Sequence, residues 1–165
     1  MLALSLIVGC TAVPRKYLEK SESTVKFSWL EATPQYYQHR LVVLGAVIVT
    51  EEVRDGVLWW HVKNRPLNEK YRPQLLPSPN DPEGGWYWII VEKHHTLPSS
   101  YHHWADMTIV GRVIGVGPEQ QPLLTLVYAR GWGMNPEHDG VWERRAGEDY
   151  GELIRDSAAP QDITQ

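Results

Sequence analysis

The chain has 165 residues, the length of one ordinary domain, and that length can bury a core without disulfide or metal staples. Hydrophobic residues make up 42% and charged residues 22%, which excludes wholesale disorder and a protein with many membrane spans. The formal net charge of -4 comes from mixed acidic and basic residues, so we expect no nucleic-acid partner. Eight Trp, eight Tyr and twelve Pro against one Phe favour a compact β domain with many turns.

The first residues form a mainly apolar stretch that ends at Cys10, the only cysteine of the chain. A single cysteine excludes an intramolecular disulfide and a cysteine-based zinc cluster. Residues 7–10 (Ile-Val-Gly-Cys) resemble a lipobox, in which small or aliphatic residues precede a cysteine that receives diacylglycerol. We therefore predict a lipoprotein signal peptide at residues 1–9 and a lipid on Cys10. The alternative is that residues 1–9 form a buried strand and that Cys10 is a core thiol.

The same stretch is too short to be a transmembrane anchor. A helix over residues 1–9 would be about 14 Å long, against a hydrocarbon core of about 30 Å. No Lys or Arg precedes Cys10, whereas a secretory signal normally opens with basic residues, so we expect the signal to be truncated at its start. Thr11 follows the cysteine where an aspartate would favour inner-membrane retention, and this resembles the outer-membrane class of lipoproteins.

The next two segments are predicted to be a tether and a short helix. Residues 10–23 are polar, with one proline and several charged side chains, and we expect them to link the lipid to the folded domain. In residues 24–32, Val25, Trp29 and Leu30 share one helical face, which predicts a short helix.

Strands are the clearest pattern in the rest of the chain. Asp55-Gly56 indicates a hairpin turn between the first two strands. Glycine in the middle of the first and fourth strands indicates bends or bulges, which a small barrel needs in order to close. We predict a mainly β fold, a small OB-like antiparallel barrel of about five to six strands with one or two short peripheral helices. The expected strands are residues 41–50, 57–62, 86–91, 107–116 and 123–128, with a proline-rich surface loop at 64–85 and a polar C-terminal tail at 143–165.

Several short motifs follow one another in residues 24–142. They are Leu-Gly-Ala-Val-Ile at 44–48, Pro-Leu-Asn at 66–68, Gly-Trp-Tyr at 85–87, Leu-Pro-Ser-Ser-Tyr at 97–101, Thr-Ile-Val-Gly-Arg-Val at 108–113 and Val-Trp at 141–142. Together with the lipobox, this ordered set resembles the Slp family of starvation-inducible outer-membrane lipoproteins. Asn68 and Trp86 stand where the family has aspartate and arginine, so a surface contact using those groups is not carried over. The resemblance implies a β domain at residues 24–142 on the outer membrane, with no attached enzymatic activity.

Four histidines lie within ten residues in two adjacent pairs, His94-His95 and His102-His103. Four imidazoles could bind zinc, nickel or copper. Adjacent residues of a strand point to opposite faces, however, and no cysteine or carboxylate completes a set of four ligands at helical spacing. We interpret them as exposed loop histidines and predict no metal site.

Three tryptophans on predicted strands are the candidate surface for a ligand or partner: Trp59, Trp86 and Trp88. Trp86 and Trp88 are two residues apart and share one face of their strand. An OB-like face can stack sugars on aromatic rings, and exposed Trp and Tyr anchor protein interfaces. The alternative is that these rings fill the core of a small barrel.

No catalytic signature is present: the sequence has no Gly-x-Ser-x-Gly elbow, phosphate loop or HExxH motif. We therefore predict no enzyme and no cofactor. The leading hypothesis is a lipoprotein anchored through Cys10 in the outer membrane of a Gram-negative bacterium, facing the periplasm, with a structural or interaction role in the envelope that is related to stress. The alternatives are a module that binds a glycan or small ligand on the Trp-rich face, and a cytosolic OB-like protein with an unlipidated Cys10.

Overall fold

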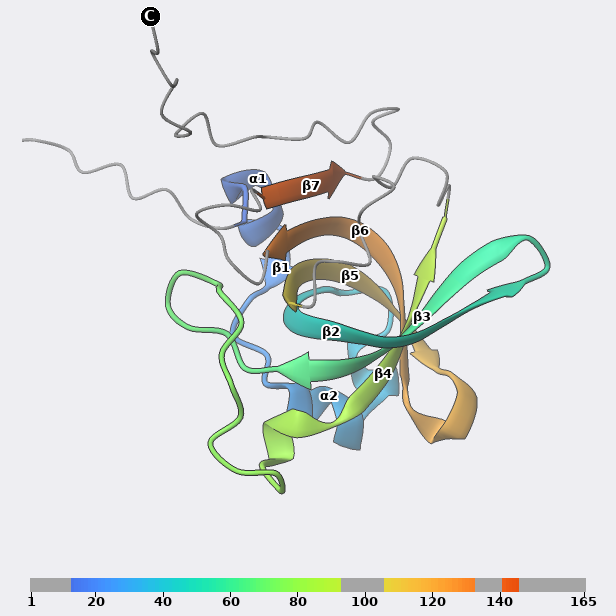
Figure 1. The fold of residues 1–165 in the computed structure, drawn as a ribbon, viewed down its shortest axis with the longest axis horizontal. Helices are drawn as coiled ribbons and strands as arrows, with labels where there is room; N and C mark the ends of the chain where they lie inside the picture. Colours follow the sequence, from blue (N-terminus) through green and yellow to red (C-terminus); the bar gives the residue numbers. More distant parts are fainter. Residues whose placement is uncertain (1–12, 93–105, 133–140, 146–165) are drawn as a thin grey trace, which may run out of the picture.

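The computed structural model of the chain describes residues 13–92, 106–132 and 141–145 (Figure 1). Its fold is mainly β, as predicted, with two short α-helices. The elements in chain order are α1 (Arg15–Leu18), β1 (Ser21–Glu22), α2 (Phe27–Ala32), the 3-10 turn η1 (Pro34–Tyr37), β2 (Leu41–Arg54), β3 (Val57–Arg65), the 3-10 turn η2 (Pro82–Gly84), β4 (Trp86–Val91), β5 (Asp106–Val116), the 3-10 turn η5 (Pro118–Gln120), β6 (Pro122–Trp132) and β7 (Val141–Arg145).

Five strands close into a barrel-like ring. The strand β2 pairs with β3 on one edge and with β5 on the other, and the pairings β3–β4, β4–β6 and β6–β5 complete the circuit. Two short strands attach to this ring, β1 beside β2 and β7 beside β6. The expectation of an OB-like ring of five to six strands is confirmed in this arrangement.

The ring departs from a purely antiparallel sheet at one seam. The strands β4 and β6 run parallel, whereas the other four ring contacts are antiparallel. Strands that alternate in direction around a closed circuit must be even in number, so a ring of five needs at least one parallel pair. Counting five strands in the sequence could therefore have predicted this seam.

The hairpin turn after β2 and the bulges of β5 lie where the sequence indicated them, whereas the register shift of β2 lies between Ile48 and Thr50 and not at Gly45. Asp55 and Gly56 both have positive φ, at 50° and 77°, as the tightest hairpin turns require. In the pairing of β5 with β6 the register shifts between Val110 and Gly111 and again between Val113 and Gly115. The predicted link between strand glycines and bulges is confirmed for these two glycines.

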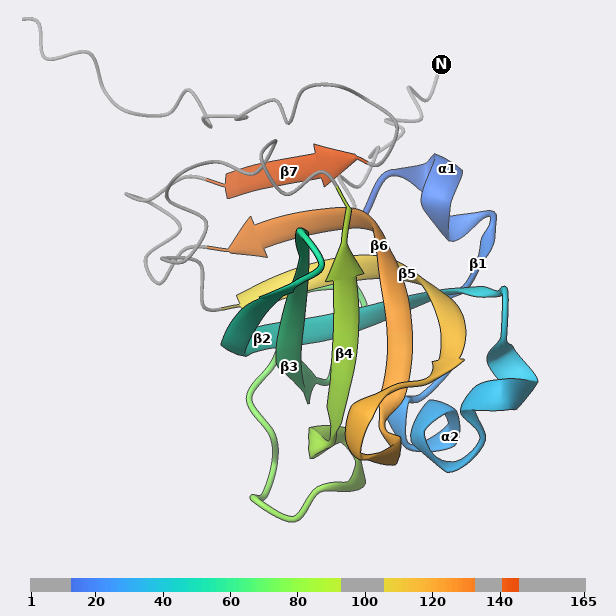
Figure 2. The same cartoon turned by 90° about the vertical axis from the view of Figure 1, so that its right-hand side faces the viewer.

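The core fills the inside of the ring, and α2 covers one end of it (Figures 1 and 2). Its largest buried side chains include Trp60, Tyr87 and Phe27. The predicted short helix is present, but its predicted face of Val25, Trp29 and Leu30 differs from the observed one: Val25 precedes α2 and Trp29 is 52% exposed. The helix begins only at Phe27, so Phe27 and Leu30, three residues apart, face the core and Trp29 points outward.

A second apolar cluster lies on the outside of the ring, under α1. Val13 and Tyr17 are buried there against Val43, Val110 and Tyr128 of β2, β5 and β6. The rings of Tyr17 and Tyr128 are 5.0 Å apart. Part of the segment predicted to be a free tether, residues 10–23, is thus packed on the sheet from Val13 onward.

The structure also extends several predicted boundaries. The hairpin arm of β2 continues to Arg54, β6 continues to Trp132, and β7 crosses the predicted end of the domain at residue 142. In the described part of the chain, no helix is long and apolar enough to cross a membrane.

One carboxylate joins the loop before β4 to the start of α2. Glu83 accepts hydrogen bonds from the backbone amides of Phe27 (2.9 Å) and Ser28 (3.2 Å) and from the Ser28 hydroxyl (2.7 Å). These amides are helix donors without a partner inside the helix, so Glu83 caps α2 from a distance of 56 residues in sequence. Nearby, partial burial and then repulsion from Glu83 raise the pKa of Glu31 above its ordinary value of 4.5.

We expect the substitution Glu31→Gln to stabilise the protein at neutral pH. A carboxyl with a raised pKa in the folded state binds protons more readily there than in the unfolded chain, so its ionisation on raising the pH lowers stability. Because Glu31 is solvent-exposed, the gain should be only about 0.3 kcal/mol. Urea unfolding should show the gain at pH 7 and lose it below the ordinary pKa of 4.5. Glu69→Gln in the exposed loop is the control, and an equal gain from it would contradict this explanation.

Candidate interaction surface

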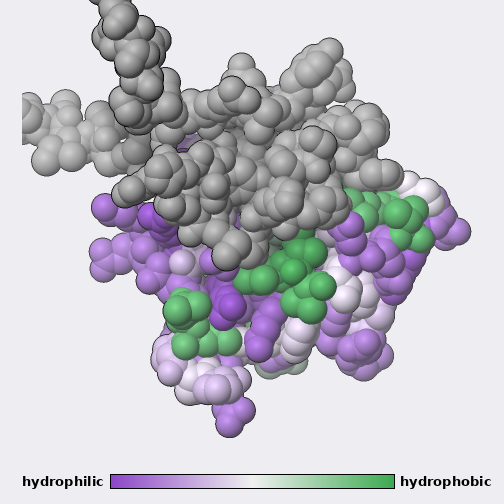
Figure 3. Space-filling model, viewed as in Figure 1, coloured by the Kyte–Doolittle hydropathy of each residue, from purple (hydrophilic) through white to green (hydrophobic). Residues whose placement is uncertain are grey.

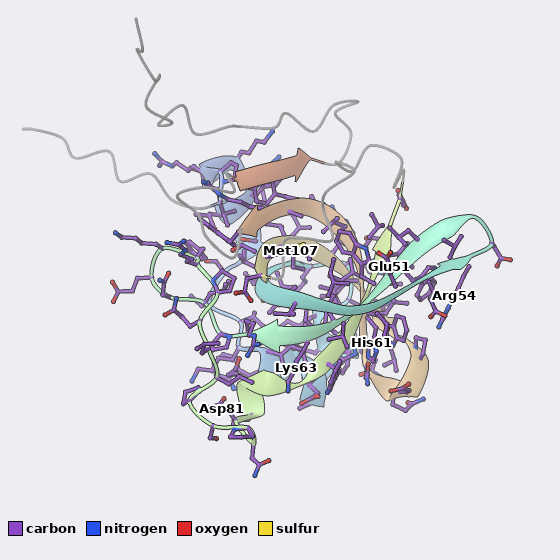
Figure 4. All side chains as sticks on the ribbon, viewed as in Figure 1. Glu51, Arg54, His61, Lys63, Asp81 and Met107 are labelled. Carbon is purple, nitrogen blue, oxygen red and sulfur yellow. The ribbon has the colours of Figure 1, made fainter. Side chains whose placement is uncertain are left out.

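The three predicted tryptophans lie on the outer face of β3 and β4. Along β3, buried and half-buried residues alternate, so Trp60 points into the core while Trp59, His61 and Lys63 point out. Figure 4 shows His61 and Lys63 on β3, with Glu51 and Arg54 on the neighbouring hairpin arm. Trp59 therefore lies on the outer face of its strand and Trp60 in the core, and the role of Trp59 in binding stays a prediction.

Antiparallel pairing places rings and cations of the two strands opposite one another. In the β3–β4 register, His61 is opposite Trp88 and Lys63 is opposite Trp86. The rings of His61 and Trp88 are stacked, with centroids 4.3 Å apart and planes 8° apart. The ammonium of Lys63 lies 5.7 Å from the Trp86 ring centroid. Such cross-strand pairs stabilise a sheet by about 0.2–1 kcal/mol each.

Diagonal neighbours connect these pairs into one row. Trp59 meets Trp88 edge to face at 6.3 Å, and His61 meets Trp86 at 4.9 Å. We call the four rings Trp59, Trp88, His61 and Trp86 the aromatic ladder. Arg54 covers the end of the ladder next to the β2–β3 hairpin. Its guanidinium lies 4.6 Å from the Trp59 ring centroid and 4.9 Å from the Trp88 ring centroid.

Polar contacts hold the ladder at its Trp59 end, through Arg54, and at its centre, through His61. Arg54 pairs with Glu52 on the same hairpin arm. On the other side, the side-chain amide of Gln121 donates to Glu119 (3.0 Å), which fixes its orientation. The Gln121 oxygen can then only accept, so His61 Nε2 donates to it at 2.8 Å. The connection between β5 and β6 is thereby attached to the centre of the ladder.

The residues of the ladder are better suited to contact with a partner than to catalysis or metal binding. Its ring faces are covered by one another and by Arg54 and Lys63, and Trp88 is only 6% exposed. In residues 13–92 and 106–132, no group of three or more His, Cys, Asp or Glu side chains could hold a metal ion. The ladder presents half-buried rings beside the guanidinium of Arg54, and tryptophan and arginine are both enriched at protein interfaces.

Sequence reasoning found the tryptophans but missed the side chains that join them. His61 was not considered, although it alternates with Trp59 and Lys63 along one strand. Arg54 was also missed, because its position over Trp59 depends on how the hairpin folds back. The predicted lipid site Cys10 and the histidines His94, His95, His102 and His103 lie outside the described residues, so their roles stay predictions.

The ring of strands with an aromatic outer surface defines a small, mainly β, barrel-like domain. The family model for "Outer membrane lipoprotein Slp family" matches residues 7–149. The chain therefore belongs to the Slp family of outer-membrane lipoproteins, as its ordered motifs predicted. Membership places it at the outer membrane of a Gram-negative bacterium as a membrane-associated lipoprotein, in a family not known for enzymatic activity. No curated protein and no solved structure matches the chain.

Proposed function

We propose that this protein is a non-catalytic contact module, anchored through a lipid on Cys10 and facing the periplasm, that binds an envelope protein through the aromatic ladder. The observation that carries the proposal is the ladder itself: three tryptophans lie on the outside of the ring, although such bulk usually fills a core. Trp and Arg are the residues most enriched at the energetic centres of interfaces. Such contacts would link the outer membrane to the bound envelope protein and in this way contribute to envelope integrity under stress.

The first described residues, from Val13 through α1, and the ladder lie on different sides of the domain. The outer cluster under α1 covers β2, β5 and β6, whereas the ladder lies on β3 and β4. Figure 2 shows α1 beside β5 and β6, away from β3. A protein held at its N-terminal end would thus leave the ladder free for a partner. The family match begins at Ile7, the first position of the lipobox, which supports Cys10 as the anchor.

Site-specific photo-crosslinking in living cells tests the contact. A photoreactive phenylalanine analogue in place of Trp86 should give crosslinked protein adducts, because Trp86 is half-buried at the exposed edge of the ladder. The matched control is the same analogue in place of Trp29, an exposed tryptophan on α2 outside the ladder. Adducts at position 86 only are expected. Equal adducts at both positions, or none at position 86, would contradict the proposed surface.

A glycan is the second candidate partner for the same face. The β3–β4 face and the β2–β3 and β5–β6 connections are the parts that OB-type domains use for oligosaccharides. Arg54 and Lys63 cover the rings, but such contacts at exposed sites are worth only about 0.5–1 kcal/mol each, so a sugar could displace them. Tryptophan fluorescence during a glycan and lipid screen separates the candidates: it should change for a glycan binder and stay flat for a protein binder.

A further inference from the structure

The strand β2 has a gap in its pairing on the edge that it shares with β1 and β3. The strand β1 pairs with β2 as far as Val42, and β3 pairs with it from Gly45 onward. Val43 and Leu44 therefore have neither strand beside them on this edge. The segment before α2 and the loop after β3 border this gap.

A cavity of about 310 Å³ occupies the gap. Val43 and Leu44 line it together with Val25 from the segment before α2 and Leu67 from the loop after β3. Asn64, at the end of β3, also lines it. The volume is at the lower end of the range for small-molecule sites. Polar and charged side chains share the lining with the apolar ones, among them Lys26, Asn68 and Glu83.

Asn64 presents an unused hydrogen-bond acceptor. Its side chain is buried, at 1% exposure, and its Nδ2 donates to the Glu83 carbonyl at 2.7 Å. Because a carbonyl can only accept, this bond fixes the amide orientation and makes the other atom the oxygen. Among the described residues this Oδ1 has no hydrogen-bond partner. Buried polar atoms in native proteins are nearly always paired, so Asn64 Oδ1 calls for an N–H or O–H donor.

Arg65, the next residue, also lines the cavity, but consecutive residues of a strand point to opposite faces of the sheet. Its side chain therefore lies on the other face of β3 from Asn64, with Nε 4.0 Å from a carboxylate oxygen of Asp106 on β5. The free acceptor of Asn64 is thus the group of this cavity that selects a ligand.

We propose that this cavity binds a small molecule that carries an N–H and a short apolar substituent, its N–H donating to Asn64 Oδ1. The apolar substituent would lie against Val25 and Leu44, which pack in the same inner cluster. The site lies apart from the aromatic ladder, at the opposite end of β3 from the hairpin, and does not depend on the ladder's partner. An N-acylated amino acid or an acetamido group has this chemistry.

Two probes that differ in a single atom test the proposal on the full-length, lipid-anchored protein in detergent. N-acetyl-L-alanine methyl ester carries the N–H, and O-acetyl-L-lactic acid methyl ester has an ester oxygen in its place. Ligand-observed NMR titration at millimolar concentrations should show that the first probe binds and that the second binds about tenfold more weakly. Equal binding of both probes, or no binding of the first, would overturn the proposal; a cavity that holds only water gives the second result.

Variants locate the binding. Asn64→Leu removes the acceptor at similar size and should weaken the first probe about tenfold. Should this variant fail to fold, Ser23→Trp decides, because Ser23 is a half-buried residue of the lining and a bulky ring there should block entry. Ser78→Trp, in the exposed loop and outside the lining, is the matched control and should leave binding unchanged. Unchanged binding in the Ser23→Trp variant would place the probe elsewhere and refute the site.

Discussion

Replacing Cys10 with alanine should abolish labelling of the protein by radioactive palmitate and remove it from the outer-membrane fraction. The thiol is the only atom of the side chain that can carry the thioether, and the chain has no second cysteine. Acyl chains contribute about 0.8 kcal/mol per buried CH₂, so the loss of two or more chains removes nearly all membrane affinity. Thr11→Ala, which changes the neighbouring residue and keeps the thiol, is the control and should retain the label.

Mass spectrometry of the native protein gives an independent readout of the same site. A lipidated Cys10 at the mature N-terminus is expected. Residues 1–9 still attached to a free thiol would contradict the anchor, and a label that survives in the Cys10→Ala variant would contradict the attachment site. Neither result would alter the membership of the chain in its family, which rests on residues 7–149.

The anchor would hold the domain close to the membrane. Val13 is buried in the cluster under α1, so only Thr11 and Ala12 separate it from Cys10. Three residue steps span at most about 10 Å. Of the segment predicted to be a short tether, residues 10–23, only the part before Val13 would therefore separate lipid and domain. Sequence polarity could not show this, because burying Val13 and Tyr17 depends on Val110 and Tyr128, about a hundred residues further along the chain.

Local patterns predicted the strands, whereas contacts between distant residues decided the rest of the fold. Alternation and turn residues placed the hairpin at Asp55-Gly56 and the bulges at Gly111 and Gly115, since each depends on a few neighbouring residues. The helix α2 was shifted in the prediction because its start is capped by Glu83, which no local pattern contains. Only part of the ladder could be predicted. Local alternation places Trp86 and Trp88 on one face of their strand, but their contacts with His61 depend on the register of β3 with β4, which is not a local pattern.

Gly45 shows most clearly that local patterns cannot predict contacts between distant residues, because glycine is required there by one backbone atom of another strand. Its position in a long strand suggested a bend, yet the register shift of β2 lies at Ile48 to Thr50 instead. A Cβ at Gly45 would lie 2.2 Å from the carbonyl oxygen of Arg65 on β3. The Gly45 carbonyl in turn accepts a hydrogen bond from the buried Tyr87 hydroxyl at 2.9 Å, and burial raises the pKa of Tyr87 well above its ordinary value. The close approach of β2 to β3 thus requires glycine here.

The substitution Gly45→Ala should therefore destabilise the protein by about 3 kcal/mol, since a backbone atom cannot move aside as a flexible side chain can. Separation of β2 from β3 would also lengthen the Tyr87 hydrogen bond. Urea unfolding followed by tryptophan fluorescence should show a lower midpoint with an unchanged slope. Gly56→Ala is the matched control: it meets no atom within 4 Å and carries only the strain of its φ of 77°, about 1 kcal/mol. A Gly45→Ala variant no less stable than Gly56→Ala would mean that β2 and β3 can separate at this point without cost, and the close approach would then not be what selects glycine.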